Sequence, residues 1–118
     1  MRRRNLLYRQ CGITEGRTLI EGMAEFLGYP KPKEVTALSA RSRRAYRGTC
    51  SSDGLIRLCP YTASVETALH ELAHFIARED STRYIRWHGK EWKETFALIK
   101  LYYRDYRRVA AQKTSNRA

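Results

Sequence analysis

The sequence has too few cysteines for a disulfide framework or a zinc ribbon. It contains three, Cys11, Cys50 and Cys59, and no two of them form a Cys-x-x-Cys pair. An odd number without such a pair is typical of free thiols in a reducing compartment. The sequence therefore predicts neither a disulfide-stabilised fold nor a ribbon-type zinc site.

Long hydrophobic runs are also missing. No segment is long enough to cross a bilayer, and the start, MRRRNLLYRQCG, has the positive charge of a secretory signal without an apolar stretch behind it. We therefore expect a cytoplasmic protein with no membrane partner. The 118 residues, 42% hydrophobic and 30% charged, have the composition of a single folded domain. Basic, flexible ends are expected at about residues 1–11 and 112–118.

Acidic residues are scarce relative to basic ones. Lys and Arg number 23 against 12 for Asp and Glu, which gives a formal net charge of +11. A field of this sign attracts polyanions, so nucleic acid is the expected partner.

Two arginine clusters are the candidate nucleic-acid contacts. The second lies in the last predicted helix, where arginines about one turn apart form a ridge beside Tyr103 and Tyr106. Arginines interleaved with aromatic residues suit a single-stranded nucleic acid, and the alternative is a solvated helix face with its tyrosines in the core. The candidate residues of the two clusters are Arg41, Arg43, Arg44, Arg47, Arg104, Arg107 and Arg108.

Hydrophobic periodicity predicts an α+β domain with three helices. They cover about residues 14–27, the stretch from Thr62 or Ser64 to Ala77 or Glu79, and residues 89–111. In the second helix, Thr62 or Ser64 is the N-cap and Glu66 lies in the first turn, where the helix dipole favours a carboxylate. The residues expected to be buried are Leu19, Ile20, Met23, Ala24, Phe26 and Leu27 in the first helix, Val65, Leu69, Leu72, Ala73 and Ile76 in the second, and Trp92, Phe96, Ile99, Tyr103 and Tyr106 in the third.

A hairpin is predicted before the second helix, with one more strand, EVTAL, at residues 34–38. The runs AYRGTC and LIRLCP flank SSDG, and Asp-Gly between such runs is a hairpin signal. With its turn at residues 53–54, Cys50 lies opposite Arg57 and Cys59 opposite Gly48. The two thiols are then not cross-strand partners, which disfavours a disulfide bond between them.

All three histidines of the chain lie within 19 residues, and two of them belong to the run HELAH. His70 and His74 are four apart, so on a helix they lie one turn apart on one face and can direct their ring nitrogens to a common point. A tetrahedral Zn²⁺ needs this arrangement of two of its ligands. Glu71 is placed to take a proton from a water on the open side of the metal.

A third zinc ligand must come from elsewhere in the chain. His88 is the favoured candidate, because three protein ligands plus water is the usual catalytic zinc pattern and the last helix can present this imidazole to the other two. Glu91 or Glu94 would instead give a site with two histidines and one glutamate. The other downstream carboxylates considered are Glu79, Asp80 and Asp105.

A structural zinc site is the main alternative to a catalytic one. Such sites close with four protein ligands, and the fourth would have to be Cys50 or Cys59. The protein would then be a basic nucleic-acid-binding module with a structural or vestigial zinc. In the catalytic case the group that stabilises the developing oxyanion stays open among Tyr46, Tyr61, Tyr84 and Arg83.

The order of these motifs resembles the SprT-like zinc metallopeptidases. HELAH, a spacer of about a dozen residues and HGKEW are similar to that family's His-Glu-x-x-His and His-Gly-x-x-aromatic segments, and RAYRGTC with DGLIRLCP resembles its hairpin. The similarity covers roughly residues 34–101. It implies zinc ligands at His70, His74 and His88, with Glu71 as general base.

The resemblance further implies a minimal zincin-like fold and a peptidase activity. The fold would be a small antiparallel sheet packed on the metal helix, with the strand at residues 55–58 bordering the cleft. Family members cleave proteins, notably those crosslinked to DNA, and DNA binding brings them to the substrate. This chain lacks the Cys-x-x-Cys ribbon of the larger members, although its own charge can replace that DNA contact. A looser resemblance, to small bacterial and phage metallohydrolases, implies the same site without a stated target.

Overall fold

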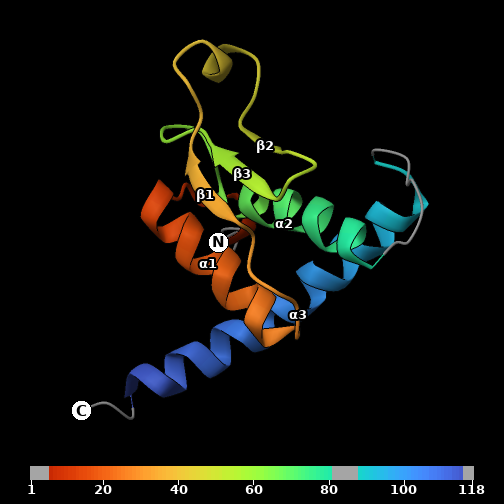
Figure 1. Ribbon diagram of the computed structural model, residues 1–118. Coiled ribbons are helices and arrows are strands. Elements are labelled where there is room, and N and C mark those ends of the chain that lie inside the picture. Colours follow the sequence, from red (N-terminus) through yellow and green to blue (C-terminus); the bar gives the residue numbers. More distant parts are fainter. Residues whose placement is uncertain (1–5, 81–87, 116–118) are drawn as a thin grey trace, which may run out of the picture.

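The computed structural model describes residues 6–80 and 88–115 (Figure 1). It is an α+β domain, which confirms the predicted fold class. The elements in chain order are η1 (Leu6–Tyr8), α1 (Ile13–Phe26), β1 (Glu34–Ala37), η2 (Ser42–Arg44), β2 (Gly48–Cys50), β3 (Leu55–Leu58), α2 (Val65–Glu79) and α3 (Lys90–Ser115).

The three strands form a mixed sheet and not the antiparallel one that was predicted. Their order is β1-β3-β2, with β2 antiparallel to β3 and β1 parallel to it. The parallel pair arises because β2 reverses the chain between β1 and β3, so the outer two strands run in opposite directions. Strand β3 is hydrogen-bonded on both sides and β2 is an edge strand.

The register of the hairpin differs by one residue from the prediction. Cys50 pairs with Ile56 and Gly48 with Leu58, because Ser51 lies opposite Leu55 and the turn between them has three residues, 52–54, in place of the two of an Asp-Gly turn. The backbone N–H of Ser51 donates to the carbonyl of Leu55 at 2.9 Å, which closes the loop. Gly54 has φ of 82°, the left-handed conformation that favours glycine.

Helix α2 begins at the predicted Ser64 cap. The Ser64 hydroxyl accepts a hydrogen bond from the backbone N–H of Thr67 at 3.2 Å, and the Thr67 hydroxyl accepts one from the backbone N–H of Ser64 at 3.1 Å. Glu66 lies in the first turn as expected. This reciprocal pair fixes the start of the helix that carries the HELAH run.

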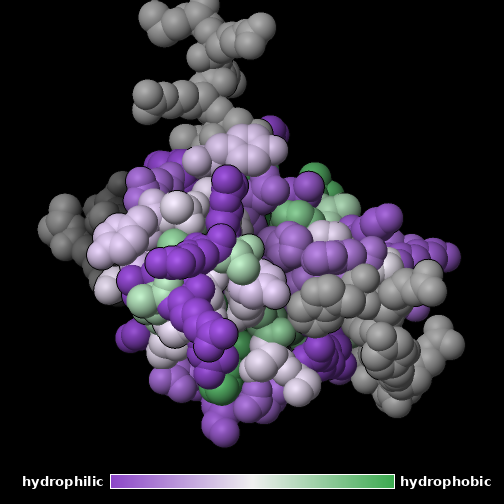
Figure 2. All heavy atoms as spheres, turned by 90° about the horizontal axis from the view of Figure 1, so that it is seen from above, coloured by the Kyte–Doolittle hydropathy of each residue, from purple (hydrophilic) through white to green (hydrophobic). Residues whose placement is uncertain are grey.

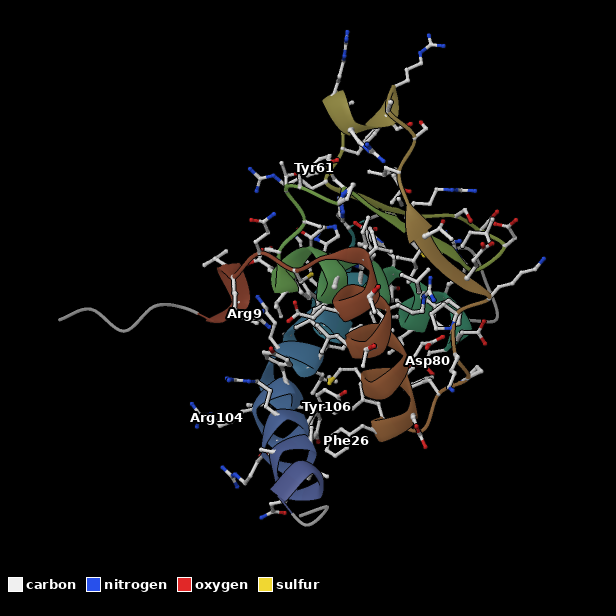
Figure 3. The ribbon with its side chains drawn as sticks, turned by 90° about the vertical axis from the view of Figure 1, so that its left-hand side faces the viewer. Arg9, Phe26, Tyr61, Asp80, Arg104 and Tyr106 are labelled. Carbon is white, nitrogen blue, oxygen red and sulfur yellow. The ribbon has the colours of Figure 1, made fainter. Side chains whose placement is uncertain are left out.

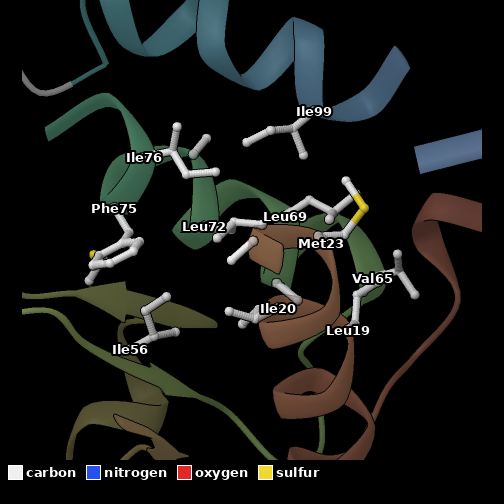
Figure 4. Packing of buried hydrophobic residues seen from close by; sticks show 14 of the residues in the cluster. Leu19, Ile20, Met23, Ile56, Val65, Leu69, Leu72, Phe75, Ile76 and Ile99 are labelled. Atoms are coloured by element: carbon white, nitrogen blue, oxygen red, sulfur yellow. The ribbon is translucent and has the colours of Figure 1, made fainter. Parts of the chain in front are cut away.

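The hydrophobic core lies around α2, between the sheet, α1 and α3 (Figures 1 and 4). Figure 4 shows Ile56 of β3 on one side of Leu72 and Ile99 of α3 on the other side of α2. The positions predicted for α2 are all buried, as are Trp92, Phe96, Ile99 and Tyr103 of α3. The prediction was wrong for Phe26, which is 39% exposed at the end of α1, whereas Leu27 and Tyr106 are partly buried against the core.

The described ends of the chain are more ordered than the predicted boundaries suggest. Residues 6–8 form η1, Gln10 bridges to Ser64, and Cys11 is buried, although this segment was assigned to a flexible end. Helix α3 continues four residues beyond the predicted end at Ala111.

All three cysteines are buried and free. In the described ranges, no helix has both the length and the apolar character that crossing a bilayer requires.

Candidate metal centre

The three histidine side chains converge on one point. The Nε2 atoms of His70 and His88 are 3.0 Å apart, and those of His74 and His70 are 3.3 Å apart. Their candidate ligand atoms all lie within 4.8 Å of one another. Two of the imidazoles come from adjacent turns of α2 and the third from the residues just before α3. The structure thus brings together the three histidines predicted as ligands.

His88 reaches the other two rings through an unusual backbone conformation. Its φ is 58°, in the left-handed region, and it is the one non-glycine residue with positive φ among those described. Histidine enters this region more readily than most residues, and non-glycine residues found there often belong to functional sites. The turn leads directly into α3, whose first bond runs from the N–H of Lys93 to the carbonyl of Gly89 at 3.0 Å.

The donor set fits a tetrahedral zinc ion. With Zn–N bonds of about 2.0 to 2.1 Å, neighbouring ligand nitrogens lie about 3.3 Å apart, close to the two measured separations. Imidazole nitrogen is also a donor that zinc favours. A single cation would satisfy all three facing nitrogens at once, which hydrogen bonds among three imidazoles cannot do with one proton on each ring.

Trp92 packs against all three imidazoles. Its ring centroid lies 4.7 Å from that of His70, 5.0 Å from His74 and 4.6 Å from His88, and it stacks on His74 with an interplanar angle of 21°. The indole N–H also donates to the backbone carbonyl of His70 at 3.4 Å. This side chain was predicted as a core residue; it is buried, and it also supports the orientation of the ligand rings.

The surroundings of His70 and His74 favour the neutral form of both imidazoles. Burial, followed by the charges of His70, His88 and Arg78, lowers the pKa of His74 to about 3. Burial and the charge of His88 lower the pKa of His70, against a smaller opposing effect of Glu66. A metal ion binds neutral imidazole, so both shifts reduce competition from protons at the site.

Glu71 follows His70 in α2, lines the same groove as His70 and is only 5% exposed. Burial raises the pKa of its carboxyl group to about 7. The side chain lies close to β2: a Cβ atom placed on Gly48 would be 3.1 Å from both Cγ and Oε2 of Glu71. Glycine at this strand position therefore makes room for the carboxylate.

A groove of about 430 Å³ opens next to Glu71 and His70. Its walls come from η1, from the segment before β2 and from the first turns of α2, and they include Tyr8, Tyr46 and Arg47. The prediction that residues 55–58 border the cleft was wrong, because β3 is paired on both sides; the bordering strand is β2. His70 and Glu71 are therefore reached from the surface through this groove.

The other predicted donors lie outside the histidine group. Within the described residues, the group that could hold a metal contains neither cysteine nor carboxylate. Burial and the charge of Glu71 raise the pKa of Cys50 to about 12, so this thiol is a poor ligand. Asp80 accepts a hydrogen bond from the Tyr29 hydroxyl at 2.6 Å. The geometry thus favours His88 over the downstream carboxylates Glu79, Asp80, Glu91, Glu94 and Asp105.

Of the candidate residues for stabilising the oxyanion, some line the groove and others do not. Tyr46 lines the groove, whereas Tyr61 lies under the guanidinium of Arg43, 5.7 Å from the ring centroid. Residues 83 and 84 lie outside the described residues.

The sequence analysis did not assign Gly48 and Trp92 to the site. A glycine inside a strand is a signal of close approach, and the tryptophan is the last residue of the HGKEW segment.

The two arginine clusters lie at opposite ends of the molecule, near η2 and along the C-terminal half of α3 (Figures 1 and 3). Arg41, Arg44 and Arg47 are exposed, whereas Arg43 donates to the carbonyl of Leu38 at 2.9 Å. The face seen from the η2 end is mostly hydrophilic (Figure 2).

On α3, Arg104 extends outward from the helix, and Arg107 lies over the ring of Tyr103. Tyr103 is buried and Tyr106 is half-buried, so the two tyrosines named with the arginine ridge pack in or against the core. Near η2, by contrast, Tyr46 is exposed.

Comparisons of the chain with protein-family models, with curated proteins and with solved structures find no match. The geometry of the histidine site is therefore the basis for assigning a function.

Proposed function

We propose that the protein is a zinc-dependent peptidase of SprT-like type with a zincin-like active site. The observation that carries this proposal is the convergence of the His70, His74 and His88 nitrogens, together with a groove lined by His70 and the buried Glu71. Three protein ligands leave one position of a tetrahedral ion for water, which is the pattern of catalytic rather than structural zinc sites.

The proposed catalytic roles of the zinc ion, Glu71 and the groove follow from the placement of the side chains. Bound zinc would lower the pKa of a coordinated water from about 15.7 toward roughly 7 and polarise the peptide carbonyl. Glu71 would accept the proton from the attacking water and return it to the leaving amine. The groove along β2 would hold the substrate chain with its scissile bond next to Glu71. Burial of this carboxylate keeps it away from competing solvent.

Nucleic acid, and DNA in particular, is the proposed partner that directs the peptidase to its substrates. The exposed Arg41, Arg44 and Arg47 next to Tyr46 support this proposal, because guanidinium groups follow phosphates while an exposed ring stacks on a base. Tyr46 and Arg47 also line the groove, so nucleic acid bound there would lie close to the active site.

Metal content and proteolysis test the proposal together. Purified protein is expected to contain one equivalent of zinc by elemental analysis and to cleave casein, with the activity abolished by a chelator and restored by added zinc. His88→Ala is expected to lose both zinc and activity. The matched control is Lys93→Ala, an exposed side chain in the first turn of α3, which should retain both.

Two outcomes would contradict the peptidase. One equivalent of tightly bound metal without cleavage, in the presence or absence of DNA, would support the alternative of a basic nucleic-acid-binding module with a structural zinc. Full metal content in His88→Ala would show that the third ligand lies elsewhere.

A further inference from the structure

A second groove shares no residue with the histidine site. It lies between the ends of α1 and α2 and the middle of α3, and its volume is about 470 Å³, within the range of ligand-binding pockets. Phe26, Tyr29, Leu98 and Tyr102 supply much of its apolar and aromatic wall, and Asp80 and Asp105 are its charged residues. In Figure 3, Phe26 lies beside Tyr106 between α1 and α3, and their ring centroids are 5.9 Å apart.

The charge of this groove is opposite to that of the molecule. The chain carries a net charge of +11, yet two carboxylates and no lysine or arginine line the groove. Asp80 is held in place by the hydroxyl of Tyr29 at 2.6 Å. Within the described part of the chain, neither Asp80 nor Asp105 forms an ion pair. A cationic group is therefore favoured here and repelled by most of the remaining surface.

The apolar surface extends beyond the groove along α3. This helix buries one stripe in the core, yet Leu98 and Leu101 on another face are 53% and 69% exposed, and Tyr102 and Val109 continue that face. From residue 98 to residue 109 the face is about 16 Å long at the helical rise of 1.5 Å per residue. Exposed apolar side chains next to a pocket mark interaction sites, and an elongated apolar face on a helix suits a polypeptide segment.

We propose that this face of α3 docks a polypeptide segment in which a lysine or arginine accompanies large apolar side chains. The apolar side chains would cover Leu98, Leu101 and Tyr102, and the cation would lie between Asp80 and Asp105. The partner is a protein segment because the surface is elongated, and it is basic because the groove is acidic. This interaction does not depend on metal binding or on peptidase activity.

Nuclear magnetic resonance titration of the ¹⁵N-labelled protein tests the proposal. The probe is a short, blocked, amphipathic peptide of leucine and lysine, and the comparison peptide has glutamate in place of lysine. The lysine peptide is expected to cause saturable shifts of the amides of Leu98, Leu101 and Tyr102, and the glutamate peptide is expected to leave these amides unshifted. Mass spectrometry checks that the peptide stays intact during the titration.

Charge-matched variants locate the contact. The double variant Asp80→Asn with Asp105→Asn should weaken binding about fivefold, as expected for two exposed ion pairs of about 0.5 kcal/mol each. The variant Glu34→Gln with Asp53→Asn makes the same change of charge at exposed positions on β1 and in the hairpin loop, and should bind like the parent. Leu101→Lys should also weaken binding, without disturbing the core.

Three results would overturn the proposal. The first is the absence of shifts on α3. The second is equal affinity for the parent and the doubly substituted acidic groove. The third is concentration-dependent dimerisation, measured by sedimentation, that is abolished by Leu101→Lys, because the face would then bind a second copy of this chain.

Discussion

Glu71 is an acidic side chain whose burial has no obvious benefit for folding. It is 5% exposed, and burial raises the pKa of its carboxyl group to about 7. Burying a carboxyl group is unfavourable unless it is paired or protonated, and strongly shifted groups of this kind cluster at functional sites. At the residue scale, a buried carboxyl group in the groove lined by His70 thus fits a chemical role better than a stabilising one.

Replacement of Glu71 separates metal binding from catalysis. Glu71→Gln keeps the size and the hydrogen-bonding capacity of the side chain but cannot take up a proton. It is expected to retain one equivalent of zinc and to lose turnover of casein by about 10² to 10⁴-fold, the usual contribution of a general base. Glu79→Gln, an exposed change in the same helix, is the control and should cleave at the parental rate. Parental turnover in Glu71→Gln would exclude this residue as the base.

Replacement of Trp92 tests whether the indole positions the ligands. Trp92→Ala should lower zinc affinity about 10 to 100-fold, as found for residues that orient metal ligands, in a competition titration with a chromophoric chelator. Removal of so large a buried side chain also costs about 3 to 5 kcal/mol of folding free energy. Trp92→Phe keeps a ring against the histidines and loses the donor to His70, so it should fold and bind zinc with intermediate affinity. Parental affinity in both variants would show that Trp92 is only a core residue.

At the scale of elements, local signals in the sequence predicted α2 but not the sheet. The Ser64 cap, the HELAH spacing and the apolar periodicity are all local, and each was confirmed in α2. The strands were located from their composition, yet neither the parallel pairing of β1 with β3 nor the three-residue turn at residues 52–54 was predicted. Strand partners depend on contacts between distant segments, and one extra loop residue changes the register.

Strand β2 and helix α2 are in such close contact that the smallest side chain is required between them. A Cβ atom on Gly48 would lie 2.9 Å from Cγ2 of Thr67 and 3.1 Å from Oε2 of Glu71. Gly48→Ala is therefore expected to destabilise the protein by about 1 to 3 kcal/mol in urea unfolding, as overpacking does. It should also lower casein cleavage while zinc is retained, because the displaced group is the carboxylate. Gly12→Ala, where a Cβ would meet nothing within 4 Å, is the control for steric overlap and should leave casein cleavage unchanged.

At the scale of the whole molecule, the metal-free protein should show opposing effects of pH on stability. The folded pKa of His74 is about 3, below its ordinary value of 6.5, so the unfolded chain binds more protons between these values and stability falls as the pH falls. The folded pKa of Glu71 is about 7, above its ordinary 4.5, so the folded protein binds more protons in that window and stability falls as the pH rises. Between pH 4.5 and 6.5 the two effects largely cancel.

Replacing Glu71 makes the effect of His74 on the pH dependence of stability measurable. Chelator-treated Glu71→Gln is expected to lose stability on acidification more steeply than the chelator-treated parent, by as much as about 1.4 kcal/mol per pH unit, the value for one linked proton. Urea unfolding at several pH values between 4.5 and 6.5 measures this slope. Parallel curves for the two proteins would mean that Glu71 titrates at its ordinary value in the folded state.

The arrangement of the whole site was only partly predictable. The motif indicated His70 and His74 because their geometry is set within one helix, and His88 was inferred from the need for a third donor. The groove was not predicted, since its walls come from η1, β2 and α2, which are distant in the sequence. The sequence separated the candidate arginines into two clusters but not their positions in space, and the fold places the two clusters at opposite ends.

Two of the imidazoles lie on α2 and the third lies just before α3, and this arrangement has a mechanical consequence. An ion bound by His70, His74 and His88 would tie the middle of α2 to the start of α3 and close the intervening chain into a ring. Because the three cysteines are free, the ion would be a reversible cross-link in a protein without disulfide bonds. Supply or withdrawal of the ion would then set how readily the two helices separate, and with it the resistance of the protein to its own degradation.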